Sequence, residues 1–259
     1  KEENLCSVMK HYDTGVMGSA VLLDHAKQEL ISEVEIDDEM KKDANSQLEY
    51  LKAMLGEEYL QVIKNIGFET ENDYVEKMLY PDLKFRKLMK TEIEKDFAKL
   101  SEEYKARQVR ILELKTEDAE KVLKEIKDGE DFDKIAKENA LLQSQFNGSK
   151  QVILLKSSQF PSTISDFLNT NNSPTLSGVL ENPENKENSY IVQIIEVDAN
   201  KIKEDTMNVL VETEEVKNKY EGIVFRNHGF KIFDRDAYDS VLKKNPAYLT
   251  DKVETNEKE

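Results

Sequence analysis

Two runs of apolar residues frame the segment from 106 to 199 and constrain the fold more than any other feature of the chain. Residues 109–114 form the first run, and residues 190–197, rich in isoleucine and valine, form the second. The first run predicts a short apolar strand, and the second, which is continuous and β-branched, predicts a central strand that is buried on both faces. Residues 116–127 and 131–140 lie between the runs and carry apolar positions at helical spacing. The segment therefore predicts a four-stranded antiparallel sheet flanked by helices.

This order of strand, helix, helix and closing strand resembles the parvulin-type peptidyl-prolyl isomerase domain. Such a domain forms no covalent bond with its substrate but lowers a rotation barrier of about 18 to 20 kcal/mol by holding the imide twisted in an apolar groove. The resemblance implies two catalytic histidines, one on the first strand and one on the last, with a nearby cysteine or aspartate. The histidines of this chain are His11, His25 and His228, which all lie outside the segment. The expected fold therefore lacks the expected chemistry.

The resemblance also locates the positions where the family's catalytic groups would stand. The first histidine falls at Ile111 or its neighbour Arg110, the second falls at Ile191, and the cysteine or aspartate falls near Leu142. A Met-x-Pro phrase of the family is reduced to Gln159-Phe160-Pro161. The degenerate active-site positions are Ile111, Leu142, Gln159 and Ile191. Isoleucine and leucine side chains form no hydrogen bonds, so we expect no catalytic residue and absent or marginal isomerase activity.

Three apolar residues of the same segment allow two interpretations. Phe160 lies within the degenerate phrase, and Phe167 and Leu168 follow it. They form either a retained peptide groove or, more simply, ordinary hydrophobic core.

The first hundred residues predict a succession of helices. One seam has apolar residues at spacings of three and four, which predicts a single buried helix face: Met40, Ala44, Leu48, Leu51 and Leu55. We expect Gly56 to end this helix and Thr70 to cap the start of a later one. Pro81 is expected to interrupt or kink that later helix.

The phrases at residues 31–40 and 67–76, followed by a long helix that leads into the parvulin-like segment, carry a second resemblance. Their order is similar to that of the PrsA-like extracytoplasmic foldases of Gram-positive bacteria, and more distantly to the SurA-like periplasmic chaperones. The resemblance spans about residues 16–200. In this family a parvulin domain interrupts a helical chaperone domain. The fold class expected is therefore α+β, a discontinuous helical domain with an inserted parvulin-like domain.

The resemblance suggests where the domains divide. Residues 1–105 would form the first part of the helical chaperone domain and residues 106–199 the parvulin-like domain. Residues 200–249 would return to the helical domain, and residues 250–259 would form a disordered tail. A fragment from Lys105 to Ala199 is then expected to fold alone, because few contacts cross a domain boundary.

Composition excludes several classes of partner. The formal charge of −16 argues against nucleic acid and against direct adhesion to an anionic membrane. Cys6 is the only cysteine, which excludes an internal disulfide and a thiolate metal cage, and we expect neither a metal nor a small-molecule cofactor. No apolar run is long enough to span a bilayer. Since the chain begins at Lys1, we expect a targeting segment to have been removed upstream.

The function implied by the foldase resemblance is transient binding of unfolded or partly folded secreted proteins. The protein would act outside the cytoplasm as a lipoprotein of the cell surface, anchored to the outer face of the membrane through the removed segment. Leu48, Leu51 and Leu55 are the candidate client-binding seam. An active isomerase with substituted residues is the first alternative, and a helical interaction or surface-adhesion protein is the second. Helical seams also allow a homodimer, although packing within one domain is the simpler interpretation.

Overall fold

The computed structural model describes residues 17–249 of the chain. Contacts within the chain divide it into two compact units. The helical unit consists of residues 17–95 and 214–249, and the sheet unit runs from Asp96 to Thr213. The helical unit is therefore discontinuous in sequence and the sheet unit is inserted in it, which confirms the α+β fold class. The boundaries within the chain and the independent folding of residues 105–199 stay predictions.

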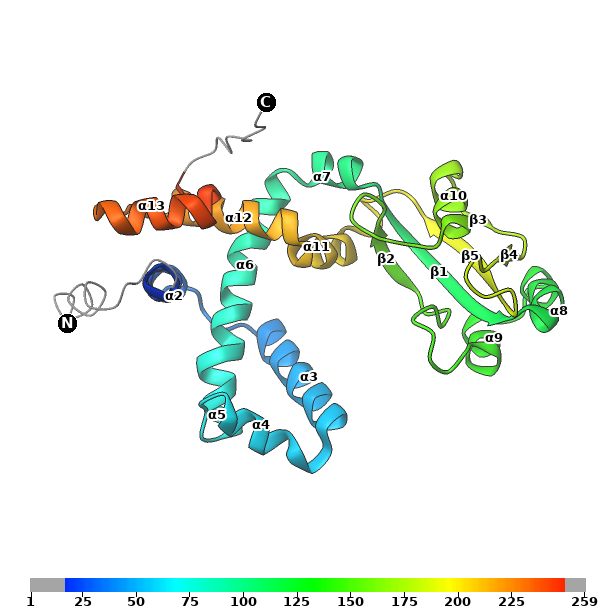
Figure 1. The fold of residues 1–259 in the computed structure, drawn as a ribbon, viewed down its shortest axis with the longest axis horizontal. Coiled ribbons are helices and arrows are strands. Elements are labelled where there is room, and N and C mark those ends of the chain that lie inside the picture. The colour runs from blue at the N-terminus through cyan, green and yellow to red at the C-terminus, as the bar shows by residue number, and fades with distance from the viewer. Residues whose placement is uncertain (1–16, 250–259) are drawn as a thin grey trace. The chain divides into compact units, whose positions relative to one another are not determined.

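The helical unit contains helices on both sides of the insertion (Figure 1). Before the insertion lie α2 (Met17–Ile31), α3 (Asp38–Leu55), η1 (Gly56–Glu58), α4 (Tyr59–Asn65), α5 (Glu71–Tyr74), η2 (Val75–Leu79) and α6 (Tyr80–Lys95). After it lie α12 (Glu214–Asn227), α13 (Arg235–Lys244) and η3 (Pro246–Tyr248).

Local sequence explains where these helices begin and end. The Asp37 carboxylate accepts a hydrogen bond of 2.9 Å from the Met40 amide and caps α3. The Thr70 hydroxyl accepts a bond of 3.1 Å from the Asp73 amide and caps α5, as predicted. Gly56 ends α3 with φ of 57°, a conformation that favours glycine, and this prediction is confirmed as well.

Pro81 lies inside a helical segment that continues from Glu71 to Lys95 through α5, η2 and α6. η2 is a π-helical turn that directly precedes Tyr80 and Pro81. Proline has no N–H to donate, and its ring collides with the carbonyl four residues earlier. A wider turn relieves that collision, and insertions of this kind are common at helix kinks. The expected interruption is thus a local widening and not a break.

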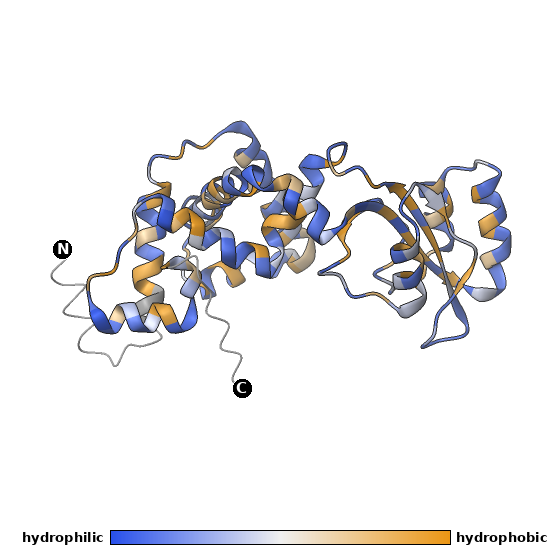
Figure 2. Ribbon diagram, turned by 90° about the horizontal axis from the view of Figure 1, so that it is seen from above, coloured by the Kyte–Doolittle hydropathy of each residue, from blue (hydrophilic) through white to orange (hydrophobic). Residues whose placement is uncertain are grey.

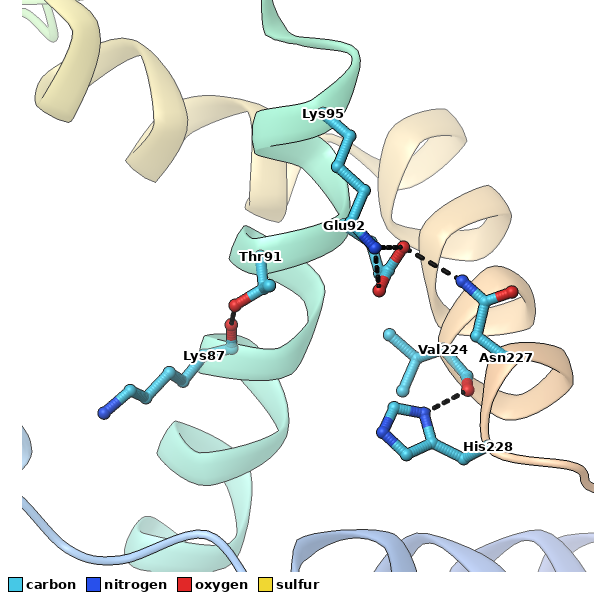
Figure 3. Close-up of polar contacts among 7 residues, drawn as sticks. All are labelled: Lys87, Thr91, Glu92, Lys95, Val224, Asn227 and His228. Carbon is cyan, nitrogen blue, oxygen red and sulfur yellow. Dashed lines mark hydrogen bonds and ion pairs between the residues drawn. The ribbon is translucent and has the colours of Figure 1, made fainter.

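α6 is the central helix of the helical unit and is contacted by α2, α3 and α12. Met40 and Ala44 of α3 pack with Leu79 and Leu83 in one buried cluster. Figure 3 shows polar contacts around the C-terminal half of α6. There the Glu92 carboxylate accepts a hydrogen bond of 3.0 Å from the side-chain amide of Asn227 on α12. His228 lies in the turn after α12, with its Nδ1 2.8 Å from the Val224 carbonyl oxygen, and acts as a turn residue there.

The end of the described chain is held against α12. A Cβ atom at Gly222 would lie 2.2 Å from the carbonyl oxygen of Ala247, so only glycine lets η3 approach this closely. The Tyr248 ring packs on the Phe225 ring with a centroid distance of 4.7 Å, and its hydroxyl donates a hydrogen bond of 2.5 Å to the Glu221 carboxylate. Burial, with the adjacent Glu221 charge, raises the pKa of Tyr248 above its usual range.

The sheet unit alternates strands with short helices (Figure 1). Its elements are α7 (Phe97–Tyr104), β1 (Ala106–Lys115), α8 (Thr116–Lys127), α9 (Phe132–Asn139), β2 (Gln151–Leu154), α10 (Ser162–Thr170), β3 (Thr175–Leu176), β4 (Leu180–Glu181), β5 (Asn188–Glu196) and α11 (Lys203–Glu212). α7 and α11 therefore belong to this unit, outside the segment 106–199.

The sheet is antiparallel, and β1 and β5 are its central strands; the second apolar run predicted the central position of β5. β2 pairs with the outer edge of β1, while β3 and β4 both pair with the outer edge of β5. The sheet thus has five strands and not the expected four, because two short strands, β3 and β4, share the position beside β5. Between β3 and β4 the Ser177 hydroxyl accepts a hydrogen bond of 2.9 Å from the Val192 amide, in place of a backbone carbonyl of a neighbouring strand.

Both faces of the sheet are covered, and this explains the continuous apolar runs. Ile164 and Leu168 of α10 cover one face, which we call the α10 face. α8 and α9 cover the other, the α8/α9 face, with Leu112 and Leu114 of β1 beneath them. Figure 2 shows hydrophobic residues following the strands of this unit.

Candidate functional site

The structure separates three of the predicted degenerate active-site positions. Ile111 on β1 is buried on the α10 face, whereas Ile191 on β5 is buried on the α8/α9 face. Leu142 is fully exposed in the turn after α9. Ile111 lies opposite Val192 and not opposite Ile191, and successive strand residues point to opposite faces. Ile111, Ile191 and Leu142 therefore do not converge.

The remaining predicted residues of the sheet unit lie beside α10. Gln159 is exposed, Phe160 and Phe167 are half-buried against the α10 face, and Leu168 is completely buried in it. Leu168 is thus core in this structure, while only the two phenylalanines reach the surface. The structure brings Phe160 and Phe167 to the same apolar cluster as Ile111.

An aromatic cluster on the α10 face was not anticipated from the sequence. The Phe146 ring lies 5.7 Å from the Tyr190 ring in an edge-to-face arrangement and 6.2 Å from the Phe160 ring. Tyr190 is on β5, two residues before Val192 and on the same face as Ile111. Phe146 lies in a loop, where no periodicity marks it as core. These rings occupy the face on which Ile111 lies.

A carboxylate on β1 organises the polar end of the α10 face. Glu113 stands directly opposite Tyr190 in the sheet. Its carboxylate accepts hydrogen bonds from the Ser144 hydroxyl at 2.5 Å, the Asn182 amide at 2.9 Å and the Asn188 amide at 3.1 Å. The backbone carbonyl and amide of Glu113 also bond to the loop between α9 and β2. The carboxylate therefore ties the loop between α9 and β2, the segment after β4 and the start of β5 to β1.

Tyr190 is the titratable side chain most strongly affected by this environment among those on the sheet. Burial, together with the negative charges of Glu113 and Glu184, raises the pKa of Tyr190 from 10.0 to about 12. The side chain is 3% exposed. The phenol is therefore neutral at physiological pH and can only act as a hydrogen-bonding group there.

Two arginines of β1 contact neighbouring helices and loops. Arg107 is buried and donates to the Leu168 carbonyl at 2.6 Å and to the Asn172 side chain at 2.7 Å, which fixes the C-terminal end of α10. Arg110, the alternative position for the first histidine, forms an ion pair with Asp133 of α9 and donates a hydrogen bond of 3.1 Å to the Gly148 carbonyl. Arg110 thus lies on the α8/α9 face, away from the aromatic cluster.

The predicted client-binding seam lies on α3 of the helical unit. Leu48 is buried, while Leu51 and Leu55 are half-buried. The exposed apolar residues of this helix are instead Tyr50 and Met54, with 70% and 61% of their surfaces accessible. They were missed because the periodicity of a helix marks the buried face and leaves isolated residues on the outer face unassigned.

Exposure of large apolar side chains differs sharply between the two units. Ten such side chains are exposed in the part of the chain that the structure describes, and Leu142 is the one that belongs to the sheet unit. The other nine belong to the helical unit: Val21, Tyr50, Met54, Leu60, Ile66, Met78, Phe233, Tyr238 and Leu242. The surface available for apolar contacts is therefore mostly helical.

The described residues contain neither a cluster of metal ligands nor a helix that could span a membrane. No group of three or more His, Cys, Asp or Glu side chains between residues 17 and 249 is arranged to hold a metal ion. Over the same range, no helix combines the length and the apolar character needed to cross a membrane. Cys6 and His11 lie outside the described residues.

Solved structures provide the informative comparison, since neither a protein-family model nor a curated protein matches this chain. PrsA from Bacillus subtilis is 19% identical, with the similarity covering 91% of each chain and a TM-score of 0.52. The foldase protein PrsA from Streptococcus pneumoniae is 20% identical over 92% of each chain, with a TM-score of 0.49. The chain has a PrsA-like fold.

Proposed function

We propose that this protein is a foldase that binds unfolded or partly folded proteins through its helical unit and has a degenerate parvulin-like unit. The observation that carries the proposal is the concentration of exposed apolar side chains on the helical unit. Binding of unfolded chains needs apolar surface that is exposed but dispersed among charges, so that the complex stays soluble. The PrsA-like fold supports the same activity.

The chemistry of the α10 face supports a degenerate isomerase unit. An isomerase needs polar groups that are free to bond with the twisted imide. On this face Ile111 and Val192 offer none, and the Glu113 carboxylate already accepts three side-chain hydrogen bonds. The same carboxylate holds the loops together, so releasing it for a substrate would cost stability.

Suppression of aggregation tests the proposed binding. The full chain should reduce light scattering by a chemically unfolded protein that is diluted into buffer. Replacing Tyr50 and Met54 together by serine removes two exposed apolar side chains and should weaken the suppression severalfold. Leu142→Ser is the matched control, because Leu142 is also exposed but lies on the sheet unit. Full suppression by the double variant, with loss in Leu142→Ser, would move binding to the sheet unit.

An active isomerase is the second candidate, and one observation favours it. Tyr190 stands opposite Glu113 beside Phe146 and Phe160, so a neutral phenol and an apolar surface share one face. A phenol of raised pKa could donate a hydrogen bond to a peptide group. This candidate predicts catalysis of isomerisation by the chain that is lost in Tyr190→Phe.

We further propose that the protein acts outside the cytoplasmic membrane, held to the membrane's outer face through an upstream segment. The foldase resemblance of residues 31–40 and 67–76 supports this location. Fractionation of cells that produce the complete precursor tests it, with recovery in the extracytoplasmic fraction expected. Recovery only with cytoplasmic proteins would contradict it. A homodimer stays a prediction, which sedimentation velocity of the purified chain would test.

A further inference from the structure

Half of the exposed large apolar side chains in the described residues lie between positions 50 and 78. We call this set the apolar corner: Tyr50, Met54, Leu60, Ile66 and Met78. The first two belong to α3, Leu60 to α4, Ile66 to the residue that ends α4, and Met78 to η2. α3 contacts both α4 and η2, so the five side chains come from neighbouring elements. Figure 1 shows α3, α4 and α5 joined in succession within this unit.

The corner is separate from the core of its own unit. Tyr50 and Met54 are four residues apart and share a face of α3, while Leu48 is buried on another face of the same helix. Ile63, which is completely buried, plays the same part in α4. Methionine side chains are flexible and polarisable and adapt to partners of different shape. The corner therefore suits apolar segments that have no fixed structure.

The charge around the corner selects among such segments. Residues 43–79 contain eight carboxylates and three lysines, a net charge of −5. Lys52 bonds to Glu49 at 3.2 Å and to Glu71 at 2.9 Å, and Lys77 pairs with Asp73, so two of the three lysines are already neutralised.

Two acidic residues between the helices of the corner are available for a partner. Glu57 and Glu58 of η1 lie between α3 and α4, are exposed, and have no ion-pair partner among the described residues. A partner that places cations next to apolar side chains would satisfy both features of this surface.

We propose that the apolar corner binds extended segments of unfolded chains in which basic residues flank apolar ones. This inference rests on the proposed foldase function and names the class of client segment that it prefers. A second copy of the chain is a poorer occupant, because it would bring two negatively charged corners together in a protein of charge −16. Segments rich in acidic residues are disfavoured for the same reason.

Fluorescence anisotropy of the full chain with two labelled peptides tests the proposal. Both peptides carry the same leucine-rich centre, one with lysine flanks and one with glutamate flanks. We expect the lysine peptide to bind about fivefold more tightly at low salt, since a few exposed charge pairs contribute this much, and the difference to shrink at high salt. Replacing Tyr50 and Met54 by serine should weaken the binding of both peptides.

Charge variants then separate selectivity from binding. Glu57→Gln with Glu58→Gln should reduce the preference for lysine flanks, while Glu130→Gln with Glu138→Gln, a matched pair of exposed carboxylates on the sheet unit, should leave it unchanged. Equal affinity for the two peptides in the unmodified chain would overturn the proposal even if aggregation suppression persists. If the unmodified chain neither binds the two peptides nor suppresses aggregation, the foldase function itself is refuted. A dimer that dissociates in the Tyr50 and Met54 variant would assign the corner to a second copy and also overturn the proposal.

Discussion

The helical unit and the sheet unit use apolar residues in opposite ways. In the sheet unit the strands are covered on both faces, and even the aromatic rings of the α10 face pack on each other. In the helical unit, α3 buries one face and presents Tyr50 and Met54 on another. The helical unit therefore leaves large apolar side chains accessible to solvent, whereas the sheet unit buries most of its own in its two core clusters.

The same contrast holds for polar groups. On the sheet unit Glu113 and Arg107 are fully engaged with loops and helix ends. On the helical unit Glu57 and Glu58 remain exposed beside apolar side chains. These polar side chains of the sheet unit are thus engaged within the fold, whereas the two carboxylates of the helical unit remain accessible to solvent.

The largest effect should come from truncating the core of the sheet unit. Leu112 is completely buried, and Leu112→Ala should lower the free energy of unfolding by about 2 to 5 kcal/mol. Tyr50→Ala on the helical unit should change it by less than about 0.5 kcal/mol, because the side chain is exposed. Urea denaturation of the two variants measures the difference. Comparable losses would show that the outer face of α3 is not a free surface.

Alkaline pH should destabilise the sheet unit through Tyr190. Its pKa is raised in the folded state. Its contribution to the free energy of unfolding is therefore fully present below pH 10.0 and is lost as pH rises toward about 12. The loss should reach about 2 to 3 kcal/mol. Denaturation from pH 9 to about pH 12 should show the stability of the chain falling relative to that of Tyr190→Phe, whose side chain cannot ionise. Parallel curves would show that the phenol is not buried as described.

Two glycines with the same backbone conformation should differ in their tolerance of a methyl group. Gly148 has φ of 80°, and a Cβ there would lie 2.5 Å from Ala136 Cβ, whereas Gly129 has φ of 93° and open space around it. Gly129→Ala should cost about 1 kcal/mol from backbone strain alone, and Gly148→Ala about 1 to 3 kcal/mol more from the clash. Thermal denaturation compares the two. Equal costs would mean that the loop at Gly148 is not seated on α9.

The smallest effect should come from the exposed ion pair of the sheet unit. The Arg110 guanidinium holds the pKa of Asp133 below its usual value of 3.8, so the pair's contribution is present above that pH and is lost as pH falls through the lower folded value. Asp133→Asn should therefore lower stability slightly at pH 7 and hardly at all in acid. Acid titration followed by circular dichroism checks this. A larger loss in acid than at pH 7 would contradict the assignment.

Much of the fold could be predicted because its determinants are local. The cap at Thr70, the end of α3 at Gly56 and the central strand β5 follow from residue type and periodicity. The division of the edge between β3 and β4 could not be predicted, since it depends on Ser177, a side chain that bonds across the sheet.

The candidate site was harder to predict because it depends on strand register. A shift of one residue moves a side chain to the other face, and this separates Ile191 from Ile111. Phe146 and Leu142 lie in irregular segments, where spacing carries no information about burial. On α3 the pattern identified the buried side, where Leu48 lies, and so pointed away from Tyr50 and Met54.

The most direct test of the account is the rate of cis/trans isomerisation of a proline tetrapeptide in the presence of the full chain. The account predicts the uncatalysed rate, because Ile111 and Val192 offer no hydrogen bonds and Glu113 is occupied by its own loops. Catalysis that rises with protein concentration and disappears in Tyr190→Phe or Glu113→Gln, with both variants still folded, would contradict it.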